Sequence, residues 1–277
     1  PTIGDNVNKE TQSSASEFLE LASEQRLAIL LKLYKEKSKV SVLAKELDAT
    51  VPEVYRNFER LVKAELITKD SDGDYSITPY GQIVCTQIPS LRFLSENKKY
   101  FKNHDFGDLP PKFLQRLGAL EGGQLIKGFV KVMEQWKEIY KNAESYIFNI
   151  LYEVPYTADF VDPLIQKVES GVKLRSILSD ESIFPMERKQ IFDKMGFKKL
   201  IEQGFIERKM KKNISVTIIL NEKEGCVMFP NKTGEVDLSN AFYHNSLEFQ
   251  EWCKDYFEYY WNNASVFQEN KLKNNKS

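Results

Sequence analysis

The chain has 277 residues and a formal net charge of -1, with 42% hydrophobic and 29% charged residues. This balance predicts an ordinary globular protein of two domains, and it argues against nonspecific coating of nucleic acid, which needs a strongly basic face. No apolar run approaches the roughly 20 residues that span a bilayer, and the polar N-terminus lacks the layout of a signal peptide, so we expect a cytoplasmic protein without a membrane partner.

The N-terminal part is predicted to hold a disordered segment over residues 1–16 and a winged helix-turn-helix over residues 17–83. Apolar residues at helical spacing predict a helix over residues 16–35 and a short helix over residues 41–47. A third helix follows and ends near Ala64. Two short apolar strands then flank an Asp-Ser-Asp-Gly-Asp turn, which is typical of a β-hairpin and would form the wing.

The start of the third helix carries clear local signals. Thr50 is suited to be the N-cap, and Glu53, three residues later, completes a capping box. Pro52 lies in the first turn, where its missing N–H costs nothing. This helix is the second of the two that form the helix-turn-helix motif, and the N-terminal end of that second helix usually enters the DNA major groove.

A basic line on the same helix is the main candidate for DNA contact. Arg56, Arg60 and Lys63 recur at i, i+4 and i+7, and a guanidinium group can donate two hydrogen bonds to guanine. The alternative is a solvated face on which Glu53 and Glu59 pair with the arginines. The predicted DNA contacts are Ser41, Lys45, Thr50, Pro52, Glu53, Tyr55, Arg56, Asn57, Arg60, Lys63 and Lys69.

The predicted wing weakens this interpretation. Asp70, Asp72 and Asp74 make its tip acidic, and only Lys69 supplies a positive charge. An acidic tip suits the minor groove poorly. The alternative is therefore a winged-helix interaction module that recruits transcription machinery or another partner without recognising DNA.

The second half of the chain is predicted to be an α/β effector and dimerisation domain with a mixed sheet. A linker helix and loop over residues 84–109, with a kink or break at Pro89, precede this domain over residues 110–264. The β-α-β order of residues 145–179 favours a parallel strand pair. A flexible tail over residues 265–277 is expected to follow.

Candidate ligand residues come from the ends and interiors of the predicted strands. Ligands of α/β domains usually bind beyond the carboxyl ends of the strands. An arginine inside an apolar strand needs an acidic partner or an anionic ligand, and a structural salt bridge is the alternative. The candidates are Asn149, Tyr152, Glu153, Arg175, Ser179 and Asp180.

The remaining chemistry-bearing residues suggest structural roles. Cys85, Cys226 and Cys253 form no Cys-x-x-Cys pair, and only two histidines are present, so we expect no metal, no cofactor and no enzymatic activity. His244 is expected in a surface loop. An aromatic cluster on a predicted C-terminal helix could form a ligand cage and comprises Trp252, Tyr256, Phe257, Tyr259, Tyr260 and Trp261. Because Trp252, Tyr256, Tyr259 and Tyr260 fall on one side of the helix, we expect core or dimer packing instead.

With both halves considered, the chain resembles the archaeal winged helix-turn-helix transcriptional regulators with a methanogenesis-regulator (FilR-type) middle domain, which are distantly TrmB-like. The segments that carry the resemblance are VSVLAKELDATVPEVYRNFERLVKAELI, YSITPYG, DLPPKFLQRLGAL, GVKLRSIL and EWCKDYFEYYWNNA, within residues 20–264.

The resemblance implies a homodimeric, sequence-specific DNA-binding regulator whose effector domain is phospholipase-D-like or TrmB-like and takes a small-molecule effector. The His-x-Lys motif of phospholipase D is absent, because Phe106 and Ser246 follow the two histidines at that spacing. We therefore expect three partners, which are double-stranded DNA, a second copy of the chain and a small-molecule effector, and no hydrolytic activity.

Overall fold

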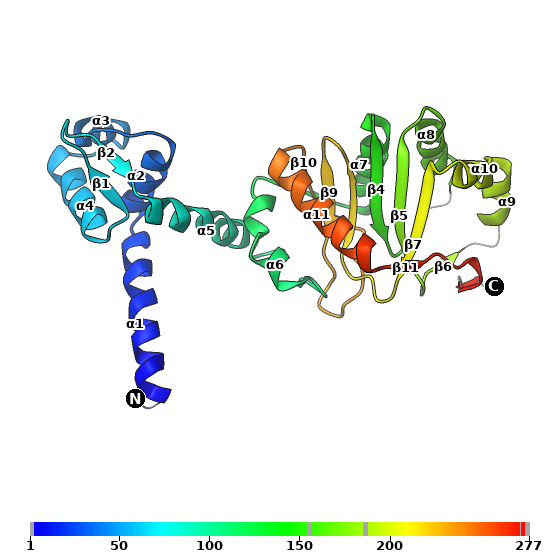
Figure 1. Ribbon diagram of the computed structural model, residues 1–277, viewed down its shortest axis with the longest axis horizontal. Coiled ribbons are helices and arrows are strands. Elements are labelled where there is room, and N and C mark those ends of the chain that lie inside the picture. The colour runs from blue at the N-terminus through cyan, green and yellow to red at the C-terminus, as the bar shows by residue number, and fades with distance from the viewer. Residues whose placement is uncertain (1–2, 154–156, 185–187, 272, 275–277) are drawn as a thin grey trace. The chain divides into compact units, whose positions relative to one another are not determined.

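The protein, described by a computed structural model, is an α+β chain that folds into two compact units, Pro1–Pro89 and Ser90–Ser277 (Figure 1). The first unit is mostly helical, and the second is built on a mixed β-sheet. The structure describes residues 3–153, 157–184, 188–271 and 273–274.

The first unit has the predicted order of helices followed by a hairpin. Its strands pair antiparallel, with Lys69 opposite Tyr75. The last helix, α5, runs through Pro89 as one helix, so the predicted break at this proline is not seen. The elements are α1 (Ile3–Leu21), α2 (Glu24–Lys35), α3 (Val40–Glu46), α4 (Val51–Lys63), β1 (Ile67–Lys69), β2 (Tyr75–Ile77) and the start of α5 (Pro79–Glu96).

The N-terminal segment differs from the prediction. Residues 1–16 were expected to be disordered, but α1 begins at Ile3, and the single helix expected over residues 16–35 is divided between α1 and α2. Ser23 starts α2, where its Oγ accepts a hydrogen bond from the Arg26 backbone N at 3.4 Å. The Arg26 side chain donates to the carbonyls of Leu19 and Glu20 at 2.9 Å, and so satisfies the C-terminal end of α1. This cap is supplied by the next helix, and the sequence carries no motif that signals it.

The second unit contains an eight-stranded sheet in the order β11-β7-β5-β4-β8-β9-β10-β3. Strands β4, β5 and β7 are parallel to one another, whereas the other pairs are antiparallel, which confirms the predicted mixed sheet. The strands are β3 (Gln124–Lys127), β4 (Tyr146–Leu151), β5 (Lys173–Ser179), β7 (Ile206–Lys211), β8 (Thr217–Asn221), β9 (Gly225–Met228), β10 (Asn240–His244) and β11 (Ser265–Val266).

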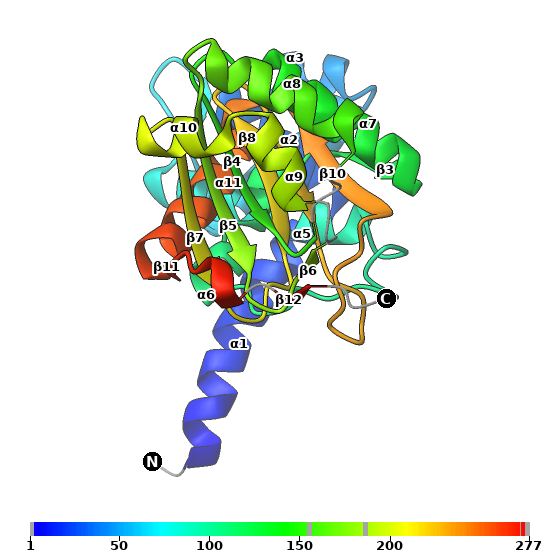
Figure 2. The ribbon, with the colours of Figure 1, turned by 90° about the vertical axis from the view of Figure 1, so that its right-hand side faces the viewer.

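Helices cover both faces of this sheet (Figure 2). One face packs on α7 (Phe129–Asn142), α8 (Ala158–Glu169), α9 (Arg188–Lys194) and α10 (Phe197–Glu202). The other face packs on α6 (Pro111–Leu114), η1 (Leu117–Leu120) and α11 (Leu247–Asn263).

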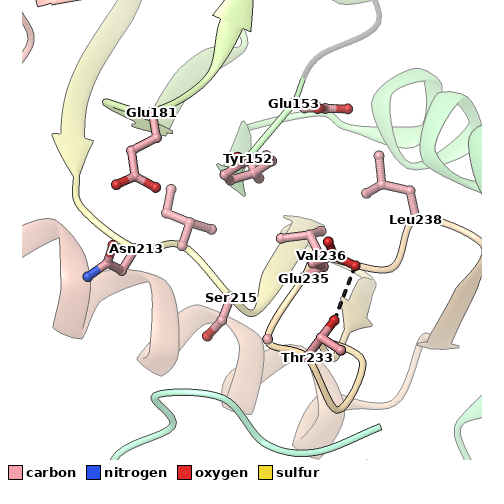
Figure 3. A pocket seen from close by; sticks show the side chains of 11 residues that line it. Tyr152, Glu153, Glu181, Asn213, Ser215, Thr233, Glu235, Val236 and Leu238 are labelled. Carbon is pink, nitrogen blue, oxygen red and sulfur yellow. Dashed lines mark hydrogen bonds between the residues drawn. The ribbon is translucent and has the colours of Figure 1, made fainter. Parts of the chain in front are cut away.

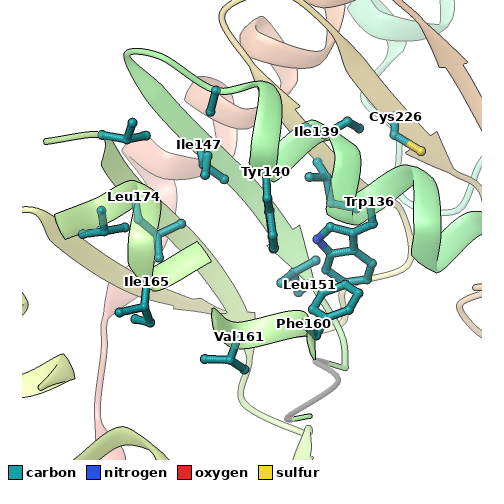
Figure 4. Packing of buried hydrophobic residues seen from close by; sticks show 14 of the residues in the cluster. Trp136, Ile139, Tyr140, Ile147, Leu151, Phe160, Val161, Ile165, Leu174 and Cys226 are labelled. Atoms are coloured by element: carbon teal, nitrogen blue, oxygen red, sulfur yellow. The ribbon is translucent and has the colours of Figure 1, made fainter. Parts of the chain in front are cut away.

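The core beneath α7 and α8 is built on aromatic contacts (Figure 4). Trp136 of α7 and Phe160 of α8 meet edge to face with ring centroids 4.9 Å apart. Both belong to the buried cluster that contains Ile147 and Leu151 of β4. Alternate residues of β4 face opposite helical layers, since Phe148 and Ile150 belong to the other cluster.

Several short strands of the second unit are missing from the sequence prediction. His244, expected in a loop, ends strand β10. The tail expected to be flexible over residues 265–277 contains β11, η2 (Glu269–Lys271) and β12 (Lys273–Asn274), which pairs with β6 (Ile183–Phe184). Strands of only two residues, such as β6, β11 and β12, are too short to show a side-chain periodicity in the sequence. The predicted core role of the aromatic cluster is confirmed for Trp252 and Tyr256, which are buried.

Candidate nucleic-acid interface and candidate ligand pocket

Helix α4 packs on α2 and α3 through one face and exposes the other. Val54, Phe58 and Leu61 are buried. Asp48, with a φ of 50°, turns the chain between α3 and α4, and the Ala49 N donates to the Ala44 carbonyl at 2.9 Å. The exposed predicted DNA contacts are Ser41, Lys45, Thr50, Pro52, Glu53, Tyr55, Arg56, Arg60, Lys63 and Lys69, whereas Asn57 is half-buried.

Arg56 is available to an external anion. Its side chain is exposed, and within the part of the chain that the structure describes no hydrogen bond or ion pair engages it. The same holds for Lys45 of α3 and Lys63 at the end of α4. These three cations are therefore the least restrained of the predicted DNA contacts.

Arg60 is engaged by α1. Its Nη2 lies 2.7 Å from Glu20 Oε1 and its Nε lies 3.1 Å from Glu20 Oε2. The hydrogen bond and the charge of Glu20 raise the pKa of Arg60. Glu53 and Glu59 are the partners of the arginines that the sequence suggests, whereas the observed partner of Arg60, Glu20, lies 40 residues away along the chain and has no local signal.

The predicted capping box at the start of α4 is not formed. Thr50 is the N-cap, but its side chain makes no capping hydrogen bond. Glu53 Oε1 instead accepts a hydrogen bond from Gln25 Nε2 at 3.1 Å, so contact with α2 replaces the reciprocal cap. The Thr50 hydroxyl is thereby left at the surface, at the end of α4 that carries Pro52 in its first turn.

Asn57 and Tyr55 are held by neighbouring side chains. The Asn57 amide donates to Gln25 and accepts from Arg26 Nη1 at 3.4 Å, which turns it toward α2. A DNA contact by Asn57 would need a change of side-chain conformation. Tyr55 is exposed, and the charge and hydrogen bond of Glu59 raise its pKa.

The acidic hairpin tip uses part of its charge internally. Asp70 Oδ1 accepts from the backbone N of Asp72 at 3.0 Å and of Asp74 at 2.9 Å. Lys37 Nζ lies 3.5 Å from Asp74 Oδ2. Lys69 Nζ lies 5.5 Å from the centre of the Tyr75 ring. The tip thus remains acidic beside a single exposed wing lysine.

A hollow of about 640 Å³ lies in the second unit beyond the carboxyl ends of the parallel strands (Figure 3). Tyr152 and Glu153 follow β4 and line this pocket. Ser179 ends β5 and Asp180 follows it, but both lie outside the lining. Ser179 is buried, and its Oγ accepts from the Glu181 N at 3.1 Å. The pocket is lined by Tyr152, Glu153, Glu181, Asn213, Ile214, Ser215, Thr233, Gly234, Glu235, Val236 and Leu238.

The pocket is acidic and rich in hydroxyl groups. Glu153, Glu181 and Glu235 contribute carboxylates, and its described lining contains no lysine or arginine. Thr233 Oγ1 donates to Glu235 Oε2 at 3.2 Å (Figure 3). Ser215 Oγ donates to Asp108 Oδ1 at 2.7 Å. Such a lining suits a neutral polar or cationic ligand rather than an anion.

A histidine that the sequence analysis did not select anchors the loop beside this pocket. His104 Nε2 lies 2.6 Å from Asp237 Oδ2, and the His104 ring stacks on Tyr100. Burial opposes ionisation of Asp237, but hydrogen bonds from His104 and Asn240 outweigh it and lower the pKa of this carboxyl. A separation of 133 residues hides this pair from sequence inspection.

Arg175 and Asn149 lie away from the pocket. Arg175 Nε donates to Glu207 Oε1 at 2.9 Å, and these residues are register partners on β5 and β7. The guanidinium lies 5.3 Å from the Trp261 ring centre. Arg175 therefore forms the structural salt bridge that was the alternative to an anion site. Asn149 is buried on the opposite face of the sheet.

Within the described residues, no three side chains of the His, Cys, Asp or Glu type are placed to hold a metal ion. None of the described helices is both long enough and apolar enough to cross a membrane. The three cysteines are buried free thiols.

Comparison with known proteins gives one family match. The family described as the HVO_A0261 N-terminal domain matches residues 14–97, which include α2 to α4 and the β1–β2 hairpin. No curated protein matches the chain.

Among solved structures, the archaeal chromatin protein TrmBL2, whose title describes a novel mode of DNA binding, is 14% identical with a TM-score of 0.42, covering 83% of this chain and 88% of that one. The phospholipase D family member Nuc from Salmonella typhimurium is 12% identical with a TM-score of 0.40, covering 53% and 99%. The dimethyltransferase RosA from Streptomyces davawensis is 9% identical with a TM-score of 0.29, covering 77% and 68%. Similarities at these TM-scores do not define a common fold.

Proposed function

We propose that the protein is a transcriptional regulator that binds double-stranded DNA through a winged helix-turn-helix made of α2, α3, α4 and the β1–β2 hairpin. In such a motif the N-terminal end of the second helix enters the major groove. The observation that carries the proposal is Arg56 near that end of α4, exposed and without a partner in the described chain. Lys45 and Lys63 supply further unpaired cations for phosphate contacts.

The remainder of the proposal concerns the whole regulator. It acts in the cytoplasm as a homodimer that recognises two half-sites about one helical turn apart. The second unit serves as its effector and dimerisation domain, without enzymatic activity. The segments quoted above support a placement among archaeal, distantly TrmB-like regulators with a FilR-type middle domain.

The few free cations explain why two copies are needed. Glu20 neutralises Arg60, and the hairpin tip carries three aspartates. Each copy therefore makes few phosphate contacts, and binding at a single half-site is weak at physiological salt. Linking two half-sites raises the affinity through effective concentration without any new contact.

The second candidate is an interaction module that recruits transcription machinery or another partner. The acidic hairpin favours it, because Asp70 and Asp74 pair with Lys37 and leave only Lys69 to meet a phosphate. A negative wing would be repelled by the DNA backbone.

Replacement of Arg56 by alanine separates the two candidates. Retention of DNA fragments selected from a genomic pool should weaken about tenfold or more, and the slope of log affinity against log salt should become shallower by about one per copy. Arg116→Ala, which removes an exposed arginine paired with Asp255 in the second unit, is the matched control and should leave both values unchanged. Unchanged retention in Arg56→Ala would refute the assignment of α4, and a wild-type slope near zero would favour the interaction module.

A further inference from the structure

A row of polar residues crosses the sheet face that α7, α8 and α10 cover. Asn149 of β4 is in register with Ser176 of β5, and Ser176 is in register with Arg208 of β7. The rows on either side are apolar throughout. They consist of Ile147, Leu174 and Ile206 on one side and Leu151, Leu178 and Met210 on the other.

The polar row borders a cavity of about 50 Å³ that is separate from the acidic pocket. Asn149 is 1% exposed, Ser176 is 7% exposed and Arg188, which reaches the cavity from α9, is 5% exposed. The rest of the wall is apolar and comprises Leu151, Val161, Leu164, Leu174, Leu178, Phe192 and Phe197 beside Tyr140. The Tyr140 and Leu151 side chains lie together in Figure 4.

The side-chain oxygen of Asn149 lacks a hydrogen-bond partner among the described residues. Asn149 Nδ2 donates to the Tyr140 hydroxyl at 3.3 Å, but Asn149 Oδ1 is buried and accepts no hydrogen bond from any described residue. A buried acceptor left unsatisfied destabilises the fold. A bound group that carries an N–H or O–H would satisfy it.

Two arginines at the cavity share a replaceable carboxylate. Arg188 Nη1 is hydrogen-bonded to Glu269 Oε1, and Arg208 Nη1 lies 3.6 Å from Glu269 Oε2. The arginine side chains are 6% and 16% exposed, whereas the Glu269 side chain is 61% exposed. Aromatic rings hold both guanidinium groups, with Arg188 over Phe192 and Arg208 over Phe267. The cations are thus fixed, and the anion that joins them lies on the surface.

We propose that this cavity binds a small carboxylic acid that also carries a hydrogen-bond donor. Its carboxylate takes the place of Glu269 between Arg188 and Arg208, a pairing that planar guanidinium groups favour. Its hydroxyl or amino group donates to Asn149 Oδ1, and its short carbon body contacts Phe192 and Phe197. A cavity of this volume holds only a few water-sized groups, which limits the ligand to a few carbon atoms.

Binding would release Glu269 and with it the short helix η2 that carries this residue. The role of this acid as an effector of DNA binding rests on the proposed function, whereas its binding does not. Titration of Arg56→Ala with the acid separates the two, because that variant should lose DNA retention and keep the carboxylate site.

The test uses calorimetry and thermal unfolding of the full chain with three probes of equal carbon number. 2-Hydroxypropionate should bind most tightly, propionate severalfold more weakly, and 1,2-propanediol not at all. Inorganic phosphate, which lacks a carbon body, should not compete. Equal responses to the diol and the acids, binding of phosphate alone, or no binding of either acid would overturn the proposal.

Variants give opposite signs, so a folding defect cannot imitate the expected pattern. Arg208→Gln should weaken binding of 2-hydroxypropionate tenfold or more, whereas Glu269→Gln should tighten it severalfold because the competing carboxylate is gone. Arg175→Gln removes an arginine from the other face of the same sheet and should leave binding unchanged. Unaltered affinity in both Arg208→Gln and Glu269→Gln would exclude this site.

Discussion

Each unit of the molecule contains a glutamate that joins two arginines, and the two bridges differ in which member is exposed. In the first unit Glu20 joins Arg26 and Arg60, and the Glu20 side chain is 16% exposed while Arg60 is 47% exposed. In the second unit the Glu269 side chain is 61% exposed, whereas Arg188 is buried and Arg208 is half-buried.

The burial of the carboxylate decides what each bridge can do. A half-buried carboxylate restrains an arginine that would otherwise reach solvent, so Glu20 limits the charge that α4 can present. An exposed carboxylate on arginines that are less exposed than itself can be exchanged for another anion. The bridge of Glu20 therefore limits the positive charge on the surface of α4, and the bridge of Glu269 occupies the arginines of the small cavity until another anion replaces it.

The largest expected effect comes from the buried arginine of the first bridge. Arg26→Met removes two hydrogen bonds to backbone carbonyls and the ion pair between Arg26 and Glu20. It should lower the free energy of unfolding of the first unit by about 3 kcal/mol. Far-UV circular dichroism measures the loss. Tryptophan fluorescence is an internal control, because Trp136, Trp252 and Trp261 all lie in the second unit.

The matched variant is Arg60→Met, which removes the ion pair between Glu20 and its more exposed partner, Arg60. It should destabilise the first unit much less than Arg26→Met does. Equal losses of unfolding free energy in the two variants would show that burial does not distinguish the two ion pairs of Glu20.

A smaller effect is expected on DNA binding. Glu20→Gln frees Arg60 while Arg56 stays as it is, so affinity for DNA should rise about two- to fivefold. Fluorescence anisotropy at several salt concentrations measures the change. Glu207→Gln, which removes a carboxylate paired with Arg175 in the second unit, is the control, and a comparable rise there would contradict a local effect of Arg60.

Asp237 of the second unit extends the comparison of carboxylates to the pH dependence of stability. Hydrogen bonds from His104 and Asn240 lower the pKa of Asp237, so its contribution to stability is present above the ordinary aspartate pKa of about 3.9 and is lost as pH falls through the lower folded value. The difference in unfolding free energy between the wild type and Asp237→Asn should thus be constant near neutral pH and shrink below about pH 4. Denaturant titrations at pH 7 and pH 3 test this, and a gap that widens at pH 3 would reverse the sign.

The smallest effect of all is expected at Thr50, the N-cap of α4. Ser246 Oγ accepts from the Phe249 N at 3.3 Å in the second unit, whereas Thr50 makes no such bond in the first. Ser246→Ala should cost about 1 kcal/mol and Thr50→Ala close to nothing. Urea unfolding compares them, and a loss at Thr50 as large as that at Ser246 would restore the predicted capping box.

The sequence predicted local features well. Strand β4 is a near-continuous apolar run that begins the predicted β-α-β unit of residues 145–179, and the predicted C-terminal helix with the aromatic cluster is α11. Contacts between residues far apart in the chain could not be predicted from the sequence. Nothing near Arg60 indicates that Glu20 pairs with it, and nothing near Asn149 indicates that Ser176 and Arg208 complete a polar row.

Of the candidate ligand residues, the structure places Tyr152 and Glu153 in the acidic pocket and Asn149 in the small cavity. The sequence rule that polar residues follow parallel strands locates a border of the sheet. It cannot say which side chains point into one hollow, because that depends on strand order and on loops such as residues 233–238.

Strand β11 protects one border of the sheet from other chains. It covers β7 through two residue pairs, Ser265 with Met210 and Val266 with Lys209. A border strand this short offers little backbone for a further strand to join. Removal of the segment after residue 264 would expose the longer β7 and its unpaired N–H and carbonyl groups, and the sheets of separate molecules could then join edge to edge. The polar tail thus keeps each sheet from becoming a template for aggregation.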